Sequence, residues 1–222
     1  MKQNDSLADR MQAGIAGFVS QCRDYLGIGG KVRREPVRDA DELHAFINSR
    51  ASFIAQTSLY GYLRTRAGMR YPELFDDDVF VASINIAKWH MWLACVSDLT
   101  VYAGGLLVHR GIPEEQTGAL MRRTVEDILV ATGVPAEADA EFPAHAERVR
   151  ARIALTPWHQ VEDGEGCFHE SPTALVKWAP VVENLKRFDE EVVRNSVRFH
   201  WKDVRAELRG MLDADAIARS LD

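Results

Sequence analysis

Cysteine is scarce in this chain of 222 residues, which contains three and no Cys-x-x-Cys pair. Cys22, Cys95 and Cys167 lie far apart in the sequence, so neither a disulfide framework nor zinc-finger spacing is present. This spacing excludes a small disulfide-stabilised scaffold and is typical of a reducing compartment. Because the first residues are polar and acidic and no signal-peptide pattern follows them, we expect a cytoplasmic protein.

The motifs of several common enzyme classes are also missing. The chain contains no Gly-x-Ser-x-Gly turn, no Walker A loop, no Gly-x-Gly-x-x-Gly and no His-Glu-x-x-His. The paired Glu-x-x-His motifs that a di-iron bundle requires do not occur either. We therefore expect no cofactor, and nothing in the motifs indicates an α/β-hydrolase fold.

Neither sign of charge is in large excess. Lysine and arginine total 27 against 33 aspartates and glutamates, which gives a net charge of −6, and 46% of residues are hydrophobic. This composition is typical of a soluble globular protein, and its acidic balance argues against nucleic acid as a partner. The longest apolar stretch, residues 79–108, is interrupted by Lys88, His90 and Asp98, so we expect no transmembrane segment.

Apolar residues recur at helical spacing through most of the chain, and prolines and glycines fall between these segments. The pattern predicts an all-α fold, a single domain over residues 1–222 with six to eight helices and a long buried central helix. An N-terminal helix is expected within residues 1–30 and a linker at 31–38. The other expected helices span residues 39–67, 79–110, 113–132, 143–155, 171–179, 181–212 and 213–221, and Asp163-Gly164 predicts a short β-hairpin over 158–170.

The expected central helix carries a stripe of small residues around one histidine. Ser83, His90 and Ser97 lie on this stripe, because steps of three and four residues stay on one helix face. Two interpretations fit the pattern. The small residues let another helix pack closely while His90 makes an internal hydrogen bond, or they leave a pocket with Trp89 and Trp92 as walls. In such a pocket the histidine would be the general base.

Two charged residues of the central helix need partners from other elements. Lys88 and Asp98 are ten residues apart, which separates them by about 280° around the helix axis. They therefore cannot pair with each other. The expected supply of charged partners is the arginine-rich end of the preceding helix.

Three arginines lie among tyrosines at that helix end. Arg64, Arg66 and Arg70 have Tyr62 close by in the sequence. Guanidinium groups beside aromatic rings suit a carboxylate or a phosphate, so this segment is a candidate for recognising an anionic ligand or an acidic partner. Alternatively, the arginines pair with the acidic residues at positions 73–78 and hold that loop closed. The acidic run is also expected to cap the central helix.

One segment contains residues of the types that bind zinc. His159, Cys167 and His169 lie within residues 158–170, and zinc accepts both histidine and cysteine ligands. If the hairpin forms, Cys167 and His169 share one face while His159 points to the other, which weakens a three-ligand site. We therefore expect no metal site, and the sequence alone leaves open whether the three residues converge in space.

Two stretches resemble a known group of proteins. Together they cover about a third of the chain. They are similar to a group of small proteobacterial proteins labelled "esterase", and they read FIAQTSLYGYLRTRAGMRYPELFDDDVFVASINIAKWHMW at residues 53–92 and ESPTALVKWAPVVENLKRFDEEVVRNSVRFHW at residues 170–201. The resemblance implies ester hydrolysis and assigns no catalytic residue.

The sequence favours a soluble helical protein that binds a small anionic or amphipathic ligand, or a protein partner, through its second and third helices. The candidate binding residues are Arg64, Arg66 and Arg70 for charge recognition and Tyr62 and Trp92 for stacking or apolar contact. Nothing in the pattern predicts an oligomeric state.

The alternative function is an esterase-type hydrolase, with His90 and Ser97 as the candidate catalytic residues. On one helix these two are seven residues apart, a rise of about 10.5 Å, which is too far for a direct hydrogen bond. A direct pair with His90 therefore requires a serine from another element, such as Ser58 or Ser171.

Overall fold

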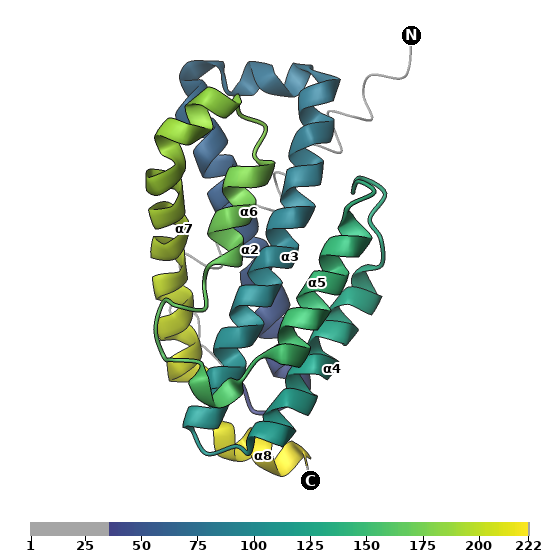
Figure 1. Ribbon diagram of the computed structural model, residues 1–222, viewed down its shortest axis with the longest axis vertical. Helices are drawn as coiled ribbons and strands as arrows, with labels where there is room; N and C mark the ends of the chain where they lie inside the picture. The colour runs from purple at the N-terminus through teal and green to yellow at the C-terminus, as the bar shows by residue number, and fades with distance from the viewer. Residues whose placement is uncertain (1–35, 222) are drawn as a thin grey trace. The chain divides into compact units, whose positions relative to one another are not determined.

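The computed structural model describes residues 36–221, which form an all-α bundle of seven α-helices without a β-strand. The predicted all-α fold class is therefore confirmed. The N-terminal helix expected within residues 1–30 and the first part of the expected linker lie outside the described residues. The helices are α2 (Ala40–Ala67), α3 (Asp78–His109), α4 (Glu114–Thr132), α5 (Phe142–Leu155), α6 (Glu170–Trp178), α7 (Glu183–Met211) and α8 (Ala214–Leu221) (Figure 1).

Helix α3 is the central element of this bundle. It packs against α2, α4, α5 and α6, while α7 lies on the outer side against α6 and α2 (Figure 1). Every residue of α3 from 91 to 107 is buried. Among the described residues α3 is the one helix long and apolar enough to cross a membrane, and 94% of its most apolar window is buried inside the bundle. The predicted long buried central helix is therefore confirmed.

Helix ends lie where the capping residues predict them. Asp39 Oδ1 accepts a hydrogen bond of 2.8 Å from the amide of Glu42 at the start of α2, and α2 ends at Gly68, whose φ of 56° suits glycine. Asp77 Oδ1 accepts a hydrogen bond of 2.8 Å from the amide of Val79 at the start of α3. The prediction that the acidic run caps the central helix is therefore confirmed through Asp77.

The last helices are separated where the sequence has Pro180. α6 ends before this proline and α7 begins after it, because proline cannot continue the hydrogen-bond ladder of a helix. The chain beyond α7 returns to the start of the described residues. The amide of Val37 donates to the carbonyl of Met211 at 2.8 Å, and the amide of Asp213 donates to the carbonyl of Val37 at 2.9 Å. The end of the expected linker is thus anchored beside α8.

The predicted β-hairpin over residues 158–170 is wrong. Trp158–Gln160 form one turn of 3₁₀-helix, and the following residues form turns and bends. The isolated bridge between Val37 and Leu212 is the strand-like pairing that the described residues contain. Asp163-Gly164 therefore marks a turn in an ordered loop between α5 and α6 and not a strand connection.

Side-chain packing on α3 explains why this loop is not a hairpin. A Cβ atom added at Gly104 would lie 2.3 Å from Cζ3 of Trp158, and one at Gly105 would lie 2.4 Å from Cγ1 of Val161. The loop therefore rests directly on the glycines of α3, and Phe168 is buried in the core beyond it. The small residues predicted that another helix packs closely against the central helix. At Gly104 and Gly105 the element that packs closely is this loop.

We predict that Gly104→Ala destabilises the protein, because the added methyl group must displace the Trp158 ring. Overpacking of this kind costs about 1–3 kcal/mol in the free energy of unfolding, which urea titration measures. Gly61→Ala in α2 is the matched control, since no atom lies within 4 Å of its added Cβ. This control should gain up to about 1 kcal/mol from helix propensity. Equal stability of the two variants would contradict the packing account.

Candidate functional site

The three candidate arginines lie at the end of α2 and just after it, and their side chains are exposed. Arg66 forms a two-pronged ion pair with Asp189 of α7. Arg70 Nε lies 3.1 Å from Glu73 Oε2, which is the loop pairing that one interpretation predicted. Arg64 has no hydrogen bond within this group. The arginine segment is thus largely engaged with neighbouring acids.

Tyr62 belongs to the same contact between α2 and α7. Its hydroxyl donates a hydrogen bond of 2.9 Å to Asp189 Oδ2. Burial and this carboxylate raise the pKa of Tyr62 to about 12, while Arg66 and Tyr62 together lower the pKa of Asp189. The sequence indicated the cations and the aromatic ring but not Asp189, because helical periodicity does not reveal which distant helix faces them.

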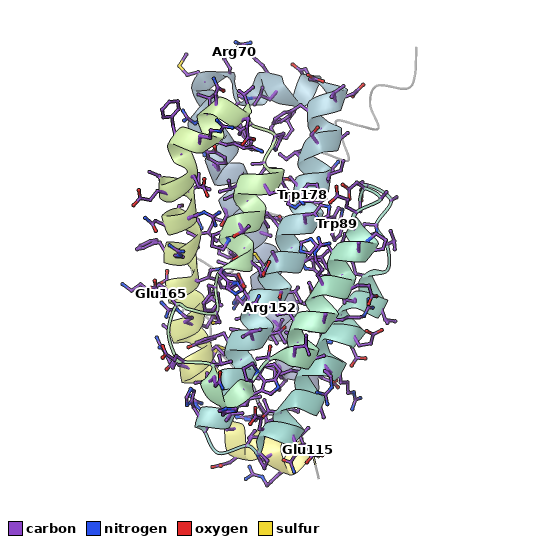
Figure 2. The ribbon with its side chains drawn as sticks, in the orientation of Figure 1. Arg70, Trp89, Glu115, Arg152, Glu165 and Trp178 are labelled. Carbon is purple, nitrogen blue, oxygen red and sulfur yellow. The ribbon has the colours of Figure 1, made fainter. Side chains whose placement is uncertain are left out.

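His90 is fully buried and makes an internal hydrogen-bond chain. Its Nε2 lies 2.9 Å from Asp139 Oδ1, and its Nδ1 lies 2.8 Å from Nδ1 of His145 in α5. The ring also stacks on Trp178 of α6, with 3.6 Å between ring centres and 3° between planes. Figure 2 shows Trp178 well below Arg70, so His90 and the arginines are separate features. Of the two interpretations of His90, the structure therefore agrees with the one in which this histidine makes internal hydrogen bonds.

The protonation of this chain follows from its partners. A carboxylate only accepts, so Nε2 of His90 carries the proton and its Nδ1 accepts from the Nδ1–H of His145. Burial lowers the pKa of His90 despite the opposing effect of Asp139. Burial, together with the charge His90 would carry, lowers the pKa of His145 to about 4. Both imidazoles are therefore neutral near pH 7.

Ser97 and Asp98 belong to a second buried network. Arg152 of α5 donates from Nη1 to Asp98 Oδ1 at 2.7 Å and to Ser97 Oγ at 2.9 Å. Asp98 Oδ2 accepts from the amide and the hydroxyl of Ser171 at 2.8 and 2.7 Å, and Trp201 Nε1 donates to Ser171 Oγ at 2.9 Å. Asp98 thus finds its partners on α5 and α6, not on the arginine-rich end of α2 where they were expected.

This network changes the expected role of two serines. Ser97 binds Arg152, whereas the hydrogen bonds of His90 go to His145 and Asp139. Ser171 was one of the serines considered as a partner for His90, but it lies in the first turn of α6 and its hydroxyl binds Asp98. Within residues 36–221 neither serine forms a hydrogen bond with His90.

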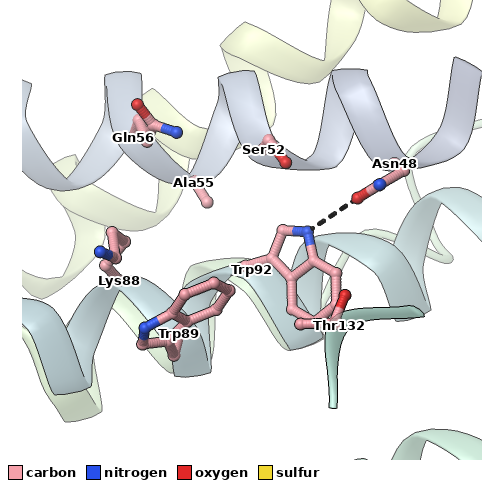
Figure 3. Close-up of a pocket in the computed structure, with 8 residues that line it drawn as sticks. All are labelled: Asn48, Ser52, Ala55, Gln56, Lys88, Trp89, Trp92 and Thr132. Atoms are coloured by element: carbon pink, nitrogen blue, oxygen red, sulfur yellow. Dashed lines mark hydrogen bonds between the residues drawn. The ribbon is translucent and has the colours of Figure 1, made fainter. Parts of the chain in front are cut away.

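A cavity of about 320 Å³ opens between α2 and α3. Trp89 and Trp92 line it, as the pocket interpretation predicted, but His90, Ser83 and Ser97 do not. The other lining residues come from α2, from α3 and from the end of α4 (Figure 3), and they are Asn48, Ser52, Ala55, Gln56, Lys88 and Thr132.

Two indole rings, several uncharged polar side chains and a single cation line this cavity. The Trp89 and Trp92 rings meet edge to face with 5.8 Å between their centres, and Trp92 Nε1 donates to Asn48 Oδ1 at 3.2 Å (Figure 3). Lys88 Nζ lies 3.3 Å from Asn85 Oδ1 and 5.0 Å from the Trp89 ring centre. No carboxylate of residues 36–221 lies within ion-pair distance of this ammonium group. Burial lowers the pKa of Lys88, with a weaker opposite effect from Glu137.

A second cavity, of about 380 Å³, lies between α4 and α5. Its walls include Arg122, Arg123 and Arg150 beside apolar residues. Two of these cations already have acidic partners, because Arg150 Nε lies 2.7 Å from Glu126 and Arg123 Nε lies 3.6 Å from Asp127. The third, Arg122, is exposed to solvent, whereas Lys88 is half-buried, so the α2–α3 cavity is the better candidate for binding an anion.

The expected zinc-type residues do not converge. His159 Nδ1 lies 3.0 Å from Glu114, His169 Nδ1 lies 3.7 Å from Glu170, and Cys167 is half-buried, with its pKa raised to about 12 chiefly by burial. Among the described residues there is no group of three or more histidines, cysteines and acids that could hold a metal ion.

We predict that the buried histidine pair makes the protein less stable as the pH falls. Because the pKa of His145 is about 4 in the fold and near 6.5 in the unfolded chain, the unfolded state takes up more protons between these values. Stability is thus complete above about pH 7 and lost progressively down to about pH 4. His145→Asn keeps a donor to His90 and removes this titration.

Urea unfolding at pH 7.5 and pH 5 measures the effect. The free energy lost between these pH values should be about 1–2 kcal/mol smaller in His145→Asn than in the wild type. His169→Asn, at an exposed histidine, is the control and should keep the wild-type loss. An unchanged loss in His145→Asn would show that this pair does not titrate as described.

Comparisons with known proteins supply no relative. No family model, curated protein or solved structure matches the chain. The similarity to proteins labelled "esterase" therefore stays a prediction. The candidate site rests on the geometry alone, and its features are two tryptophans, an amide and one half-buried lysine between α2 and α3.

Proposed function

We propose that this protein binds a small amphipathic anion, an apolar or aromatic molecule with a carboxylate or similar acidic group, in the cavity between α2 and α3. The observation that carries the proposal is Lys88. This ammonium group is half-buried at the cavity wall and lies within ion-pair distance of no carboxylate of the described residues. Desolvating a cation without a counter-charge is costly, and an anionic ligand would supply that charge.

The cavity walls favour an aromatic or apolar body on this ligand. Trp89 and Trp92 present rings to the space, and edge-to-face or stacked contacts with such rings stabilise aromatic ligands. Ser52 and Gln56 add hydrogen-bonding groups from α2. Cavities of a few hundred Å³ that combine aromatic rings with polar groups able to orient a ligand are typical of small-molecule sites. In this proposal Lys88 recognises the anionic group, the role that the sequence analysis gave to the three arginines. Trp92 makes the apolar or stacking contact, as expected.

Ester hydrolysis has less support in the geometry. Ser58 Oγ lies 3.0 Å from Nδ1 of His200, a serine–histidine contact between α2 and α7. However, Ser58 is only 4% exposed, so a substrate has little access to its hydroxyl. A nucleophile also needs hydrogen-bond donors for the developing oxyanion, and the backbone amides in the interior of α2 are already used by the helix.

We predict that the wild-type protein binds 2-naphthoate at least about 10-fold more tightly than 2-naphthamide, its neutral analogue, because only the carboxylate can form a charge-assisted hydrogen bond with Lys88. Isothermal titration calorimetry measures both affinities. Lys88→Met keeps the apolar stem and should abolish the preference for the anion. Ser52→Phe should weaken both ligands by filling the space.

Lys202→Met is the control for the loss of one positive charge. Lys202 is exposed on α7, outside the lining of the cavity, so this variant should keep the preference for naphthoate. Equal affinity of the wild type for both ligands, or an unchanged preference in Lys88→Met, would refute the proposed site.

A further inference from the structure

The α2 wall of the α2–α3 cavity carries a row of polar side chains. Asn48, Ser52 and Gln56 all line the cavity and are spaced four residues apart, so they lie on one face of α2. The row extends over about 12 Å, at 1.5 Å per residue. Opposite it, α3 presents the rings of Trp89 and Trp92 (Figure 3). The cavity is therefore largely aromatic on one wall and able to form hydrogen bonds on the other.

Ser52 contributes a free hydrogen-bonding group to this row. Hydroxyl groups in helices commonly donate to the carbonyl one turn earlier, as Thr65 Oγ1 does to Gly61 at 2.9 Å. The half-buried Ser52 hydroxyl forms no hydrogen bond with any of residues 36–221, and it points from α2 toward α3 (Figure 3). A ligand that fills the space beside such a hydroxyl must supply the hydrogen bond that water would otherwise make.

A contact between the two walls shows the order of these groups along the cavity. Trp92 Nε1 donates to Asn48 Oδ1 at 3.2 Å, so these two residues mark one end. Figure 3 shows α2 and α3 running in opposite directions, with Lys88 at the other end and Ser52 between the two ends. A ligand whose acidic group binds Lys88 therefore places its ring between the indoles and the polar row, with Ser52 beside the edge of the ring.

An unsubstituted aromatic ring matches only one of the two walls. It packs well against the indoles, but its C–H edge leaves the Ser52 hydroxyl without a partner, and an unpaired polar group at a contact reduces affinity. A hydroxyl group on the ring can both donate and accept, as Ser52 can, so the two groups are able to pair. A site that hydrogen-bonds a ligand hydroxyl discriminates against the analogue that lacks it.

We propose that the ligand of the α2–α3 cavity is a hydroxylated aromatic acid, with its acidic group on Lys88, its ring against the two indoles and its hydroxyl hydrogen-bonded to Ser52. This inference rests on the proposed function, which supplies the contact with Lys88, and it adds the substituent that the α2 wall recognises. Aromatic acids that carry a methyl group in place of the hydroxyl bind less tightly, because a methyl group cannot pair with Ser52.

Isothermal titration calorimetry of the full chain with substituted 2-naphthoates tests this assignment. The probes carry either a hydroxyl or a methyl group at ring position 6 or 7, so each pair differs in hydrogen bonding and little in size. At one of these positions or both, the wild type should bind the hydroxyl form about 3- to 10-fold more tightly than the methyl form. Ser52→Ala should lose this preference, because it removes the side-chain hydroxyl and suits a helix.

Ser49→Ala is the matched control on the same helix. Ser49 lies outside the cavity lining, and its hydroxyl donates to the carbonyl of Phe46 at 3.1 Å, so this variant should keep the preference for the hydroxyl form. Methyl forms that bind as tightly as the hydroxyl forms at both positions, or a preference that persists in Ser52→Ala, would overturn this inference and leave the proposed function standing. A wild type that does not bind 2-naphthoate itself would refute both.

Discussion

The buried carboxylate of Asp98 is the constraint on which the arrangement of this bundle depends. It lies on the central helix, and its oxygen atoms accept hydrogen bonds from Arg152 of α5 and from the amide and hydroxyl of Ser171 in α6. Ser171 in turn accepts from Trp201 of α7. A fully buried charge is tolerated only when its partners are complete, so α5, α6 and α7 are held in one position around α3.

Lys88, His90 and Asp98 have different surroundings on α3. Asp98 has an ion pair and several further donors, and His90 has a carboxylate, a second imidazole and a stacked indole. Lys88 has one amide oxygen and an aromatic ring beside an open cavity. Asp98 and His90 are therefore satisfied by the protein itself, and Lys88 is the group to which the proposed function assigns an external anion. This contrast is the physical basis of the proposed function.

The sequence alone predicts the local features of this fold well. Capping and backbone chemistry act over a few residues, so they fix where helices begin and end. They account for the helix starts at Asp39 and Asp77, the helix ends at Gly68 and Gly111, and the break at Pro180. The prediction of a β-hairpin was wrong because Asp163-Gly164 specifies a turn but does not specify that the turn connects two strands. Trp158 and Val161 pack on the glycines of α3 instead, a tertiary contact that local propensity does not encode.

The candidate site was predictable only in part. Trp92 lies in the candidate cavity. The arginines were overvalued in part because Asp189, the partner of Arg66, lies more than 100 residues away in the sequence. The sequence did show that Lys88 needs a partner from another element. That unmet need was the one signal in the sequence that pointed to Lys88 as a site residue. Which of the charges on α3 is satisfied within the fold depends on Arg152, Asp139 and His145, whose positions only the tertiary structure reveals.

The most direct measurement of the central claim is an NMR titration of the lysine ammonium groups, with and without bound 2-naphthoate. In the free protein the Lys88 ammonium should have a pKa below the ordinary lysine value, because it is half-buried and no carboxylate of residues 36–221 pairs with it. Binding of the carboxylate should raise this pKa. A Lys88 pKa that stays the same while naphthoate is bound would contradict the account.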